Sequence, residues 1–330
     1  MKIGGVNINN LKIGNTTVNE VFIGTNKIFP NTISEYIFKI NTALGNGNDT
    51  FQFTVPSGGT KDFDINFGDG TQVNNVTSHA DSRLNHSYSS GGVYTIKVNI
   101  RDLKSYVIGQ GSDGLKYIDI VNWGDNSTLT SLIFLFKGAN NLTSISATDS
   151  PNLTNCTTFR EFMRSSPLNA DLSGWDFSSG INFQLACLGA TGLNSSLGNN
   201  VFSSMTIGNS VFQSVSSNTS SLANLTIGGN VSYFFYFAQN FAYNTLTNVD
   251  FSAVTNATGF FQNSDLNNSE YQNFLVDLTG WNGTTATKTL QSNVPFHFGT
   301  AKYAIGGASE DVRTYLTSTK GWTITDGGGI

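Results

Sequence analysis

A leucine-centred phrase returns every 24 to 29 residues through the middle of this chain. Successive copies, separated by 26, 25, 29 and 24 residues, are marked by Leu142, Leu168, Leu193, Leu222 and Leu246. This period is too long for one strand and too short for a domain, and it is typical of solenoids, whose stacked repeats bury a continuous core. Asn, Ser, Thr and Gly between the copies suit the corners of coils. We therefore expect residues 104–266 to form an irregular solenoid.

The first 29 residues carry a second, much shorter repeat. Ile3, Ile13 and Ile23 fall in strict ten-residue register, and each is followed by glycine. This period does not fit the 3.6-residue helical repeat, and it suits short β-strands separated by tight turns. Because an isolated hairpin is marginal in water, we expect residues 1–30 to be a β meander that docks onto another domain or chain. The candidate docking residues are Ile3, Ile13, Ile23 and Phe29.

The composition favours a mainly β fold and excludes several classes of partner. Charged residues make up 12% of the chain, against roughly 25% in an average soluble domain, and Asn, Ser, Thr and Gly, which disfavour helices, take their place. The net charge of −5 argues against a nucleic-acid partner held through its phosphates. No apolar stretch is long enough for a membrane span, and we expect no cleaved secretory signal.

Residues 31–103 contain alternating strands around three short motifs. The motifs are F-G-D-G at residues 67–70, H-x-Y at 86–88 and G-x-Y-x-I-x-V at 92–98. Together they resemble the PKD-type immunoglobulin-like domain, which implies a β-sandwich that acts as a spacer or adhesion module. Asp64 and Asp69 are conceivable calcium ligands, and His86 a conceivable metal ligand, but strand and turn roles are favoured because Ca²⁺ needs six or more converging oxygens. Whether calcium binds stays open.

The repeats and the C-terminal segment carry a second resemblance. Phrases such as L-S-G-W-D-F at residues 172–177 resemble the BspA-like leucine-rich repeats of surface proteins, and a parallel β-helix is the alternative. Residues 267–330 resemble a C-terminal ending of BspA-like proteins from marine bacteria and their phages, and we expect them to cap the last coil. Ser269 and Ser309 are the predicted N-caps of two helices in this cap.

No arrangement of residues in the sequence predicts catalysis, a cofactor or a metal site. The three histidines lie in different modules, and Cys156 and Cys187 are best explained as two buried thiols, although one disulfide stays open. A glycosidase pair is conceivable because acids on successive coils can flank a groove. Turn and capping roles are favoured for these acids, which are Glu161, Asp171, Asp176 and Asp250.

The short repeat near Met1 resembles those of phage tail and fibre proteins, and together with the other resemblances it implies a bacteriophage virion protein without enzymatic activity. We expect a tail fibre, head fibre or capsid decoration, homo-oligomeric, whose N-terminus binds other virion proteins. The solenoid would face the host surface, with Tyr233, Tyr236 and Tyr243 as candidate glycan contacts. The alternatives are a virion-associated polysaccharide depolymerase and a bacterial cell-surface adhesin. The position on the particle and the host receptor stay open.

Overall fold

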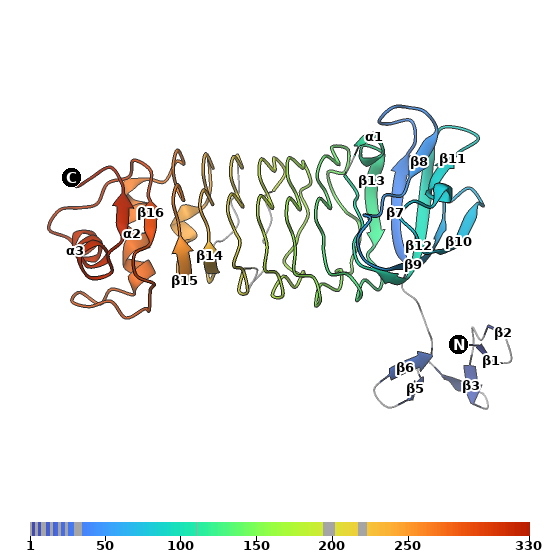
Figure 1. Ribbon diagram of the computed structural model, residues 1–330, viewed down its shortest axis with the longest axis horizontal. Helices are drawn as coiled ribbons and strands as arrows, with labels where there is room; N and C mark the ends of the chain where they lie inside the picture. Colours follow the sequence, from blue (N-terminus) through green and yellow to red (C-terminus); the bar gives the residue numbers. More distant parts are fainter. Residues whose placement is uncertain are drawn as a thin grey trace.

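The computed structural model describes residues 35–109, 111–193, 202–216 and 223–330, together with six short strands within residues 1–34. The protein is mainly β with few helices, as the composition predicted. Figure 1 shows a strand-rich unit at one end, drawn in blue and green, then a row of coils, and an orange and red cap that contains most of the helices. No helix of the described residues is both long and apolar enough to cross a membrane.

The ten-residue repeat forms three β-hairpins. These are β1 (Lys2–Ile3) with β2 (Val6–Asn7), β3 (Leu11–Ile13) with β4 (Thr16–Val18), and β5 (Val21–Ile23) with β6 (Asn26–Phe29). Ile3, Ile13 and Ile23 each pair with the residue three positions further along. Two residues therefore separate the innermost paired positions of each hairpin in the sequence. The predicted short strands are confirmed, but they pair as three separate two-stranded sheets and not as one continuous meander. The docking role stays a prediction.

Residues 36–122 form a sandwich of two antiparallel sheets. Its strands are β7 (Tyr36–Asn41), β8 (Thr50–Gln52), β9 (Lys61–Asn66), β10 (Gln72–Val76), β11 (Asn85–Ser87), β12 (Val93–Leu103) and β13 (Tyr117–Asn122), with a 3-10 turn at Ser82–Leu84 and the short α1 at Gly111–Gly114. Five strands pair in the order β10-β9-β12-β7-β13, and β11 pairs with β8. Alternate residues of β7 and β9 are buried, as expected for strands that cover a core on one face.

The three sandwich motifs meet at one turn. Gly68 has φ 82°, and a Cβ there would lie 2.5 Å from the carbonyl oxygen of Thr95. Asp69 accepts hydrogen bonds from the Thr71 N–H at 2.9 Å and pairs with His86 Nε2 at 2.7 Å. Although burial raises the pKa of Asp69, these hydrogen bonds outweigh it and hold that pKa below its ordinary value. Asp69 therefore has the structural role that the sequence favoured.

Asp64 lies on β9, away from that turn, and its carboxylate also has protein partners. Its carboxylate receives the Arg101 guanidinium at 2.6 Å and the Asn75 N–H at 2.7 Å. The Arg101 contact holds the pKa of Asp64 below its ordinary value. No group of three or more His, Cys, Asp or Glu side chains among the described residues is arranged to hold a metal ion.

The row of coils is held together by parallel backbone bridges. Bridges connect the starts of six successive coils, which are Ser131, Thr158, Asn182, Ile207, Asn230 and Asn256. Alternate N–H groups of one coil donate to carbonyls of the next, for example Phe136 to Phe162 at 2.8 Å and Cys187 to Val211 at 2.9 Å. Just before two of these coil starts, β14 (Thr226–Asn230) runs parallel to β15 (Asp250–Asn256), and this ladder ends at the Asn230–Asn256 bridge. The main chain is therefore satisfied between neighbouring coils, as in a stack.

Each coil contains a pair of left-handed residues that lie four positions apart. These pairs, with φ between 54° and 79°, are Phe134 and Gly138, Glu161 and Ser165, Leu185 and Gly189, Ser210 and Ser214, Tyr233 and Phe237, and Gly259 and Asn263. Non-glycine residues are rare in this conformation, which costs roughly 1–2 kcal/mol for each. Between the two positions, consecutive side chains such as Leu135 and Phe136 are both buried. The left-handed residues therefore turn adjacent apolar side chains into the core.

The core is one connected cluster from the sandwich to the cap. Stacked, tilted and edge-on ring pairs form a chain in which neighbouring centroids are at most 5.9 Å apart. We call it the aromatic spine, and it runs through Phe38, Tyr36, Trp123, Trp175, Phe177, Phe159, Phe183, Phe202, Phe234, Phe260, Phe296 and Trp322. The repeat residues Leu142, Leu172, Leu225 and Val249 are buried as predicted, and Leu197 lies outside the described residues. Cys156 and Cys187 are free, buried thiols.

The sandwich is joined to the coils through its edge strand. Ser146 and Ala147 donate their N–H groups to the Ile120 carbonyl of β13, at 3.0 and 2.9 Å. The Asp149 carboxylate accepts the Trp123 N–H at 2.9 Å. Strand β13 extends this sheet to residue 122, beyond the sandwich segment 31–103 of the sequence analysis, and the core continues into the coils. The sandwich thus covers the first coil, as a solenoid end requires.

The last coil is covered by the C-terminal cap. The cap contains α2 (Asn268–Thr279), α3 (Ala308–Thr314), a π-helical turn at Tyr315–Thr319, and the parallel strands β16 (Pro295–His297) and β17 (Thr323–Thr325). Both predicted N-caps are wrong. Asn267 caps α2, because its side chain accepts the N–H of Glu270 while the Glu270 carboxylate accepts that of Asn267. Gly307 precedes α3, and the Ser309 hydroxyl bonds to Ala304.

Candidate functional site

The acids considered for catalysis are used in turns and ion pairs. Asp171, Asp176 and Asp250 each accept the backbone N–H two residues further on, at 2.9, 3.0 and 2.8 Å. Glu161 is 7% exposed and lies between Lys137 at 2.7 Å and Arg164 at 2.8 Å. Burial raises the pKa of Glu161, but the two cations outweigh that effect and keep it lowered. Each acid therefore has a structural partner that accounts for its position.

Two of the three predicted glycan contacts lie together on the surface. Tyr233 is 39% exposed and Tyr236 is half-buried, with their ring centroids 5.3 Å apart. The predicted glycan contact at Tyr243 is wrong, because this side chain is 2% exposed and its hydroxyl donates to the Ala238 carbonyl at 3.3 Å. It packs between the rings of Phe235 and Phe261, which leaves no face for a ligand.

Phe237 is a third surface aromatic that the sequence did not single out. It is 48% exposed, and its ring centroid lies 4.6 Å from that of Tyr236. Tyr233 and Phe237 form the left-handed pair of their coil, and this backbone conformation directs their rings away from the core. We call Tyr233, Tyr236 and Phe237 the aromatic patch.

Polar and small residues surround the aromatic patch. In the neighbouring coils, the residues in register with Tyr236 and Phe237 are Gln213 and Ser214 on one side, and Gln262 and Asn263 on the other. Gly259 occupies the position of Tyr233 in the next coil, where a Cβ would collide with the tyrosine ring. The patch is therefore a group of rings within an amide- and hydroxyl-rich face.

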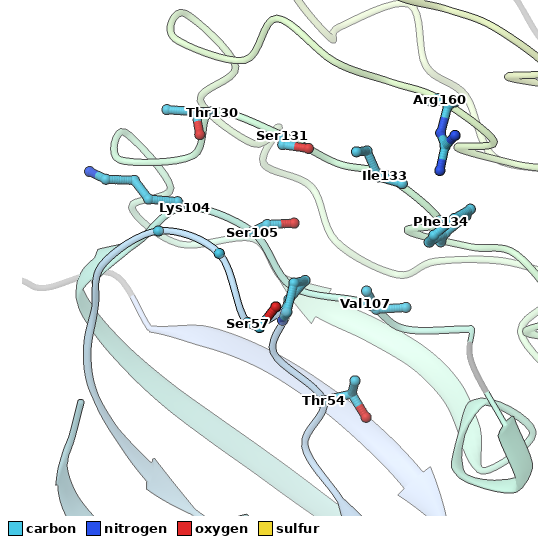
Figure 2. A pocket seen from close by; sticks show the side chains of 13 residues that line it. Thr54, Ser57, Lys104, Ser105, Val107, Thr130, Ser131, Ile133, Phe134 and Arg160 are labelled. Carbon is cyan, nitrogen blue, oxygen red and sulfur yellow. The ribbon is translucent and has the colours of Figure 1, made fainter. Parts of the chain in front are cut away.

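A groove of about 540 Å³, here called the junction groove, lies where the sandwich meets the coils. Figure 2 shows its parts: residues 54–59 of the sandwich, residues 104–107 after β12, residues 130–134 of the first coil, and Arg160 of the second. Lys104 at its rim pairs with Asp102 at 2.7 Å. No local sequence pattern indicates this groove, because four segments far apart in the chain form it.

The comparisons with known proteins concern one part of the chain. Residues 105–225 match a family described as "Mycoplasma protein of unknown function, DUF285". This region extends from the segment that lines the junction groove through four coils, and it is less than half of the chain. No match was found among curated proteins or solved structures.

Proposed function

We propose that this protein is a non-enzymatic, adhesive component of a bacteriophage particle, displayed on its surface as a tail fibre, head fibre or capsid decoration. The N-terminal hairpins dock it to other virion proteins, and a homo-oligomer presents the coils to the host surface. In this proposal the sandwich is of the PKD type and the coils are BspA-like leucine-rich repeats. The observation that carries the proposal is the aromatic patch, a group of uncovered rings on a polar face.

The aromatic patch has the chemistry of a carbohydrate contact. Aromatic rings present large apolar faces at a small entropic cost, and tyrosine adds a hydroxyl that bonds in water or to a ligand. Sugar rings combine apolar C–H faces with hydroxyl groups, so they match rings flanked by Gln, Asn and Ser side chains. Uncovered rings favour a binding role, because solvent exposure of large apolar side chains is otherwise unfavourable.

The hairpins should be required for attachment but not for folding. We expect a fragment of residues 31–330 to stay folded and soluble, because the described core begins at Tyr36. In phage-infected cells that produce the fragment in place of the full chain, purified particles should lack it. Immunoblotting of gradient-purified particles measures this result. Normal incorporation of the fragment would contradict the docking role.

The aromatic patch should be required for host contact but not for attachment. Particles that carry Tyr233→Ala with Phe237→Ala should contain normal amounts of the protein, yet adsorb to host cells at least tenfold less. Both side chains are more than a third exposed, so we expect little change in the thermal midpoint. Ile305→Ala, at an exposed apolar side chain of the cap, is the matched control. Equal adsorption of all three particle types would refute the contact.

A further inference from the structure

In the part of the chain that the structure describes, no carboxylate neutralises the positive charge of Arg160. Its guanidinium lies 5.3 Å from the ring centroid of Phe134, and Lys137 lies 4.5 Å from the same centroid. Within the described part of the chain, no acid is within ion-pair distance of Arg160, whereas Arg164 in the same coil is bound to Glu161. The Phe134 ring therefore holds in place a cation that is free to bind an anion at one end of the junction groove (Figure 2).

The walls of the junction groove offer hydrogen bonds that the protein does not use. None of the hydroxyls that line it bonds to another described residue; they belong to Thr54, Ser57, Ser105, Thr130 and Ser131. Val107 and Ile133 add apolar surface between these hydroxyls. A ligand with several hydroxyl groups and an apolar face fits this lining better than a purely apolar one does.

A backbone carbonyl at the groove also lacks its usual donor. At the position of Ile133 in later coils, the carbonyls of Arg160, Gln184 and Asn209 accept N–H groups from the preceding coil, at 3.1, 3.0 and 3.0 Å. The Ile133 carbonyl has no such donor among the described residues. Two residues further on, the Leu135 carbonyl accepts the N–H groups of Ile108 and Gly109, so by this register the Ile133 carbonyl is directed toward the segment that precedes Ile108. A ligand hydroxyl would satisfy this acceptor.

We propose that the junction groove binds an acidic sugar unit, a hexuronate within a polysaccharide. Its carboxylate pairs with Arg160, its hydroxyls bond to the serine and threonine hydroxyls and to the Ile133 carbonyl, and its apolar ring face packs on Val107 and Ile133. The groove volume lies within the roughly 300–1,000 Å³ that is typical of small-ligand sites. This site is separate from the aromatic patch and does not depend on the virion assignment.

Calorimetric titration of the full chain with trigalacturonic acid tests this proposal. We expect saturable binding that weakens as salt rises, because a charge pair contributes. Arg160→Gln should weaken binding by about tenfold or more, as expected for loss of a charged hydrogen bond. Arg164→Gln, which removes an equal charge that is already paired within the same coil, should change affinity less than about twofold. Unchanged thermal midpoints establish that both variants are folded.

Two further probes identify what the groove recognises. The fully methyl-esterified trimer keeps the sugar rings but lacks the carboxylate charges. Its affinity for the wild-type protein should be no higher than the affinity of trigalacturonic acid for Arg160→Gln. Glutarate has carboxylates without a sugar ring, and it should bind at least tenfold more weakly than the trimer. The proposal would be overturned if the trimer did not bind, or if the ester bound as tightly as the acid. It would also be overturned if glutarate bound as tightly as the trimer, or if both arginine variants had equal effects.

Discussion

Replacing Trp123 by alanine is expected to destabilise the sandwich and the first coils together, by about 3–5 kcal/mol in the free energy of unfolding. Trp123 is fully buried where the two parts meet. Its ring centroid lies 5.9 Å from the ring centroid of Tyr36 in the sandwich and 5.0 Å from that of Trp175 in the coils. Its removal leaves a cavity that both parts line. Urea unfolding measures the energy, and hydrogen exchange measures where protection is lost.

The amides that lose protection from hydrogen exchange show whether the sandwich and the coils share one core. In Trp123→Ala, amides of β7 and β12 and amides of residues 131–163 should all exchange faster. Trp281→Ala is the control, since this partly buried ring packs near Tyr315 in the cap, with centroids 6.0 Å apart. Its effect should be confined to the cap. Loss of protection in the sandwich alone after Trp123→Ala would mean that the two parts are independent units.

Asp326→Asn should be the most costly change of a charged residue in the cap. The Asp326 side chain is 3% exposed, receives Arg313 Nε at 2.7 Å, and accepts the Tyr271 hydroxyl at 2.6 Å. Asparagine keeps the shape but leaves Arg313 without its counter-charge, at a cost of about 2–3 kcal/mol. Asp311→Asn, at an exposed site on α3, should cost less than about 1 kcal/mol.

The same pair gives a pH dependence with a definite sign. Burial raises the pKa of Asp326, but Arg313 and Tyr271 outweigh this effect and keep it below the ordinary value near 4. The carboxylate therefore stabilises the cap above about pH 4, and this contribution is lost as the pH falls through the lowered pKa. The difference in free energy of unfolding between wild type and Asp326→Asn should shrink between pH 7 and pH 3. A constant difference would exclude the ion pair as its cause.

Periodicity was the part of the fold that the sequence could reveal. The ten-residue repeat predicted short strands, and the longer repeat predicted buried positions such as Leu142 and Val249, because burial follows the spacing of apolar residues. Helix starts were placed two residues late for α2, since Asn267 and Ser269 are both good caps and only the contact with Glu270 distinguishes them. The sequence did not indicate the left-handed pairs, because residues such as Phe134 and Leu185 rarely adopt positive φ.

The candidate sites were less predictable than the fold. Tyr233 and Tyr236 were found because aromatic residues stand out in a polar sequence, but the same criterion selected the buried Tyr243 and missed Phe237. Exposure depends on which way each coil turns its side chains, and that direction is set by the left-handed residues. The junction groove depends on how the sandwich sits against the first coils, which no local pattern encodes.

The sandwich covers the first coil and the helical cap covers the last. The number of coils between them can therefore change during evolution while both end structures stay the same. Inserting or deleting one whole coil, about 25 residues, keeps both end surfaces intact and preserves the backbone ladder. Each such event changes the length of the molecule by roughly 4.8 Å, the spacing of neighbouring strands. Relatives with more or fewer coils would thus hold the surface residues of their last coils at different distances from the sandwich, without any change to either end.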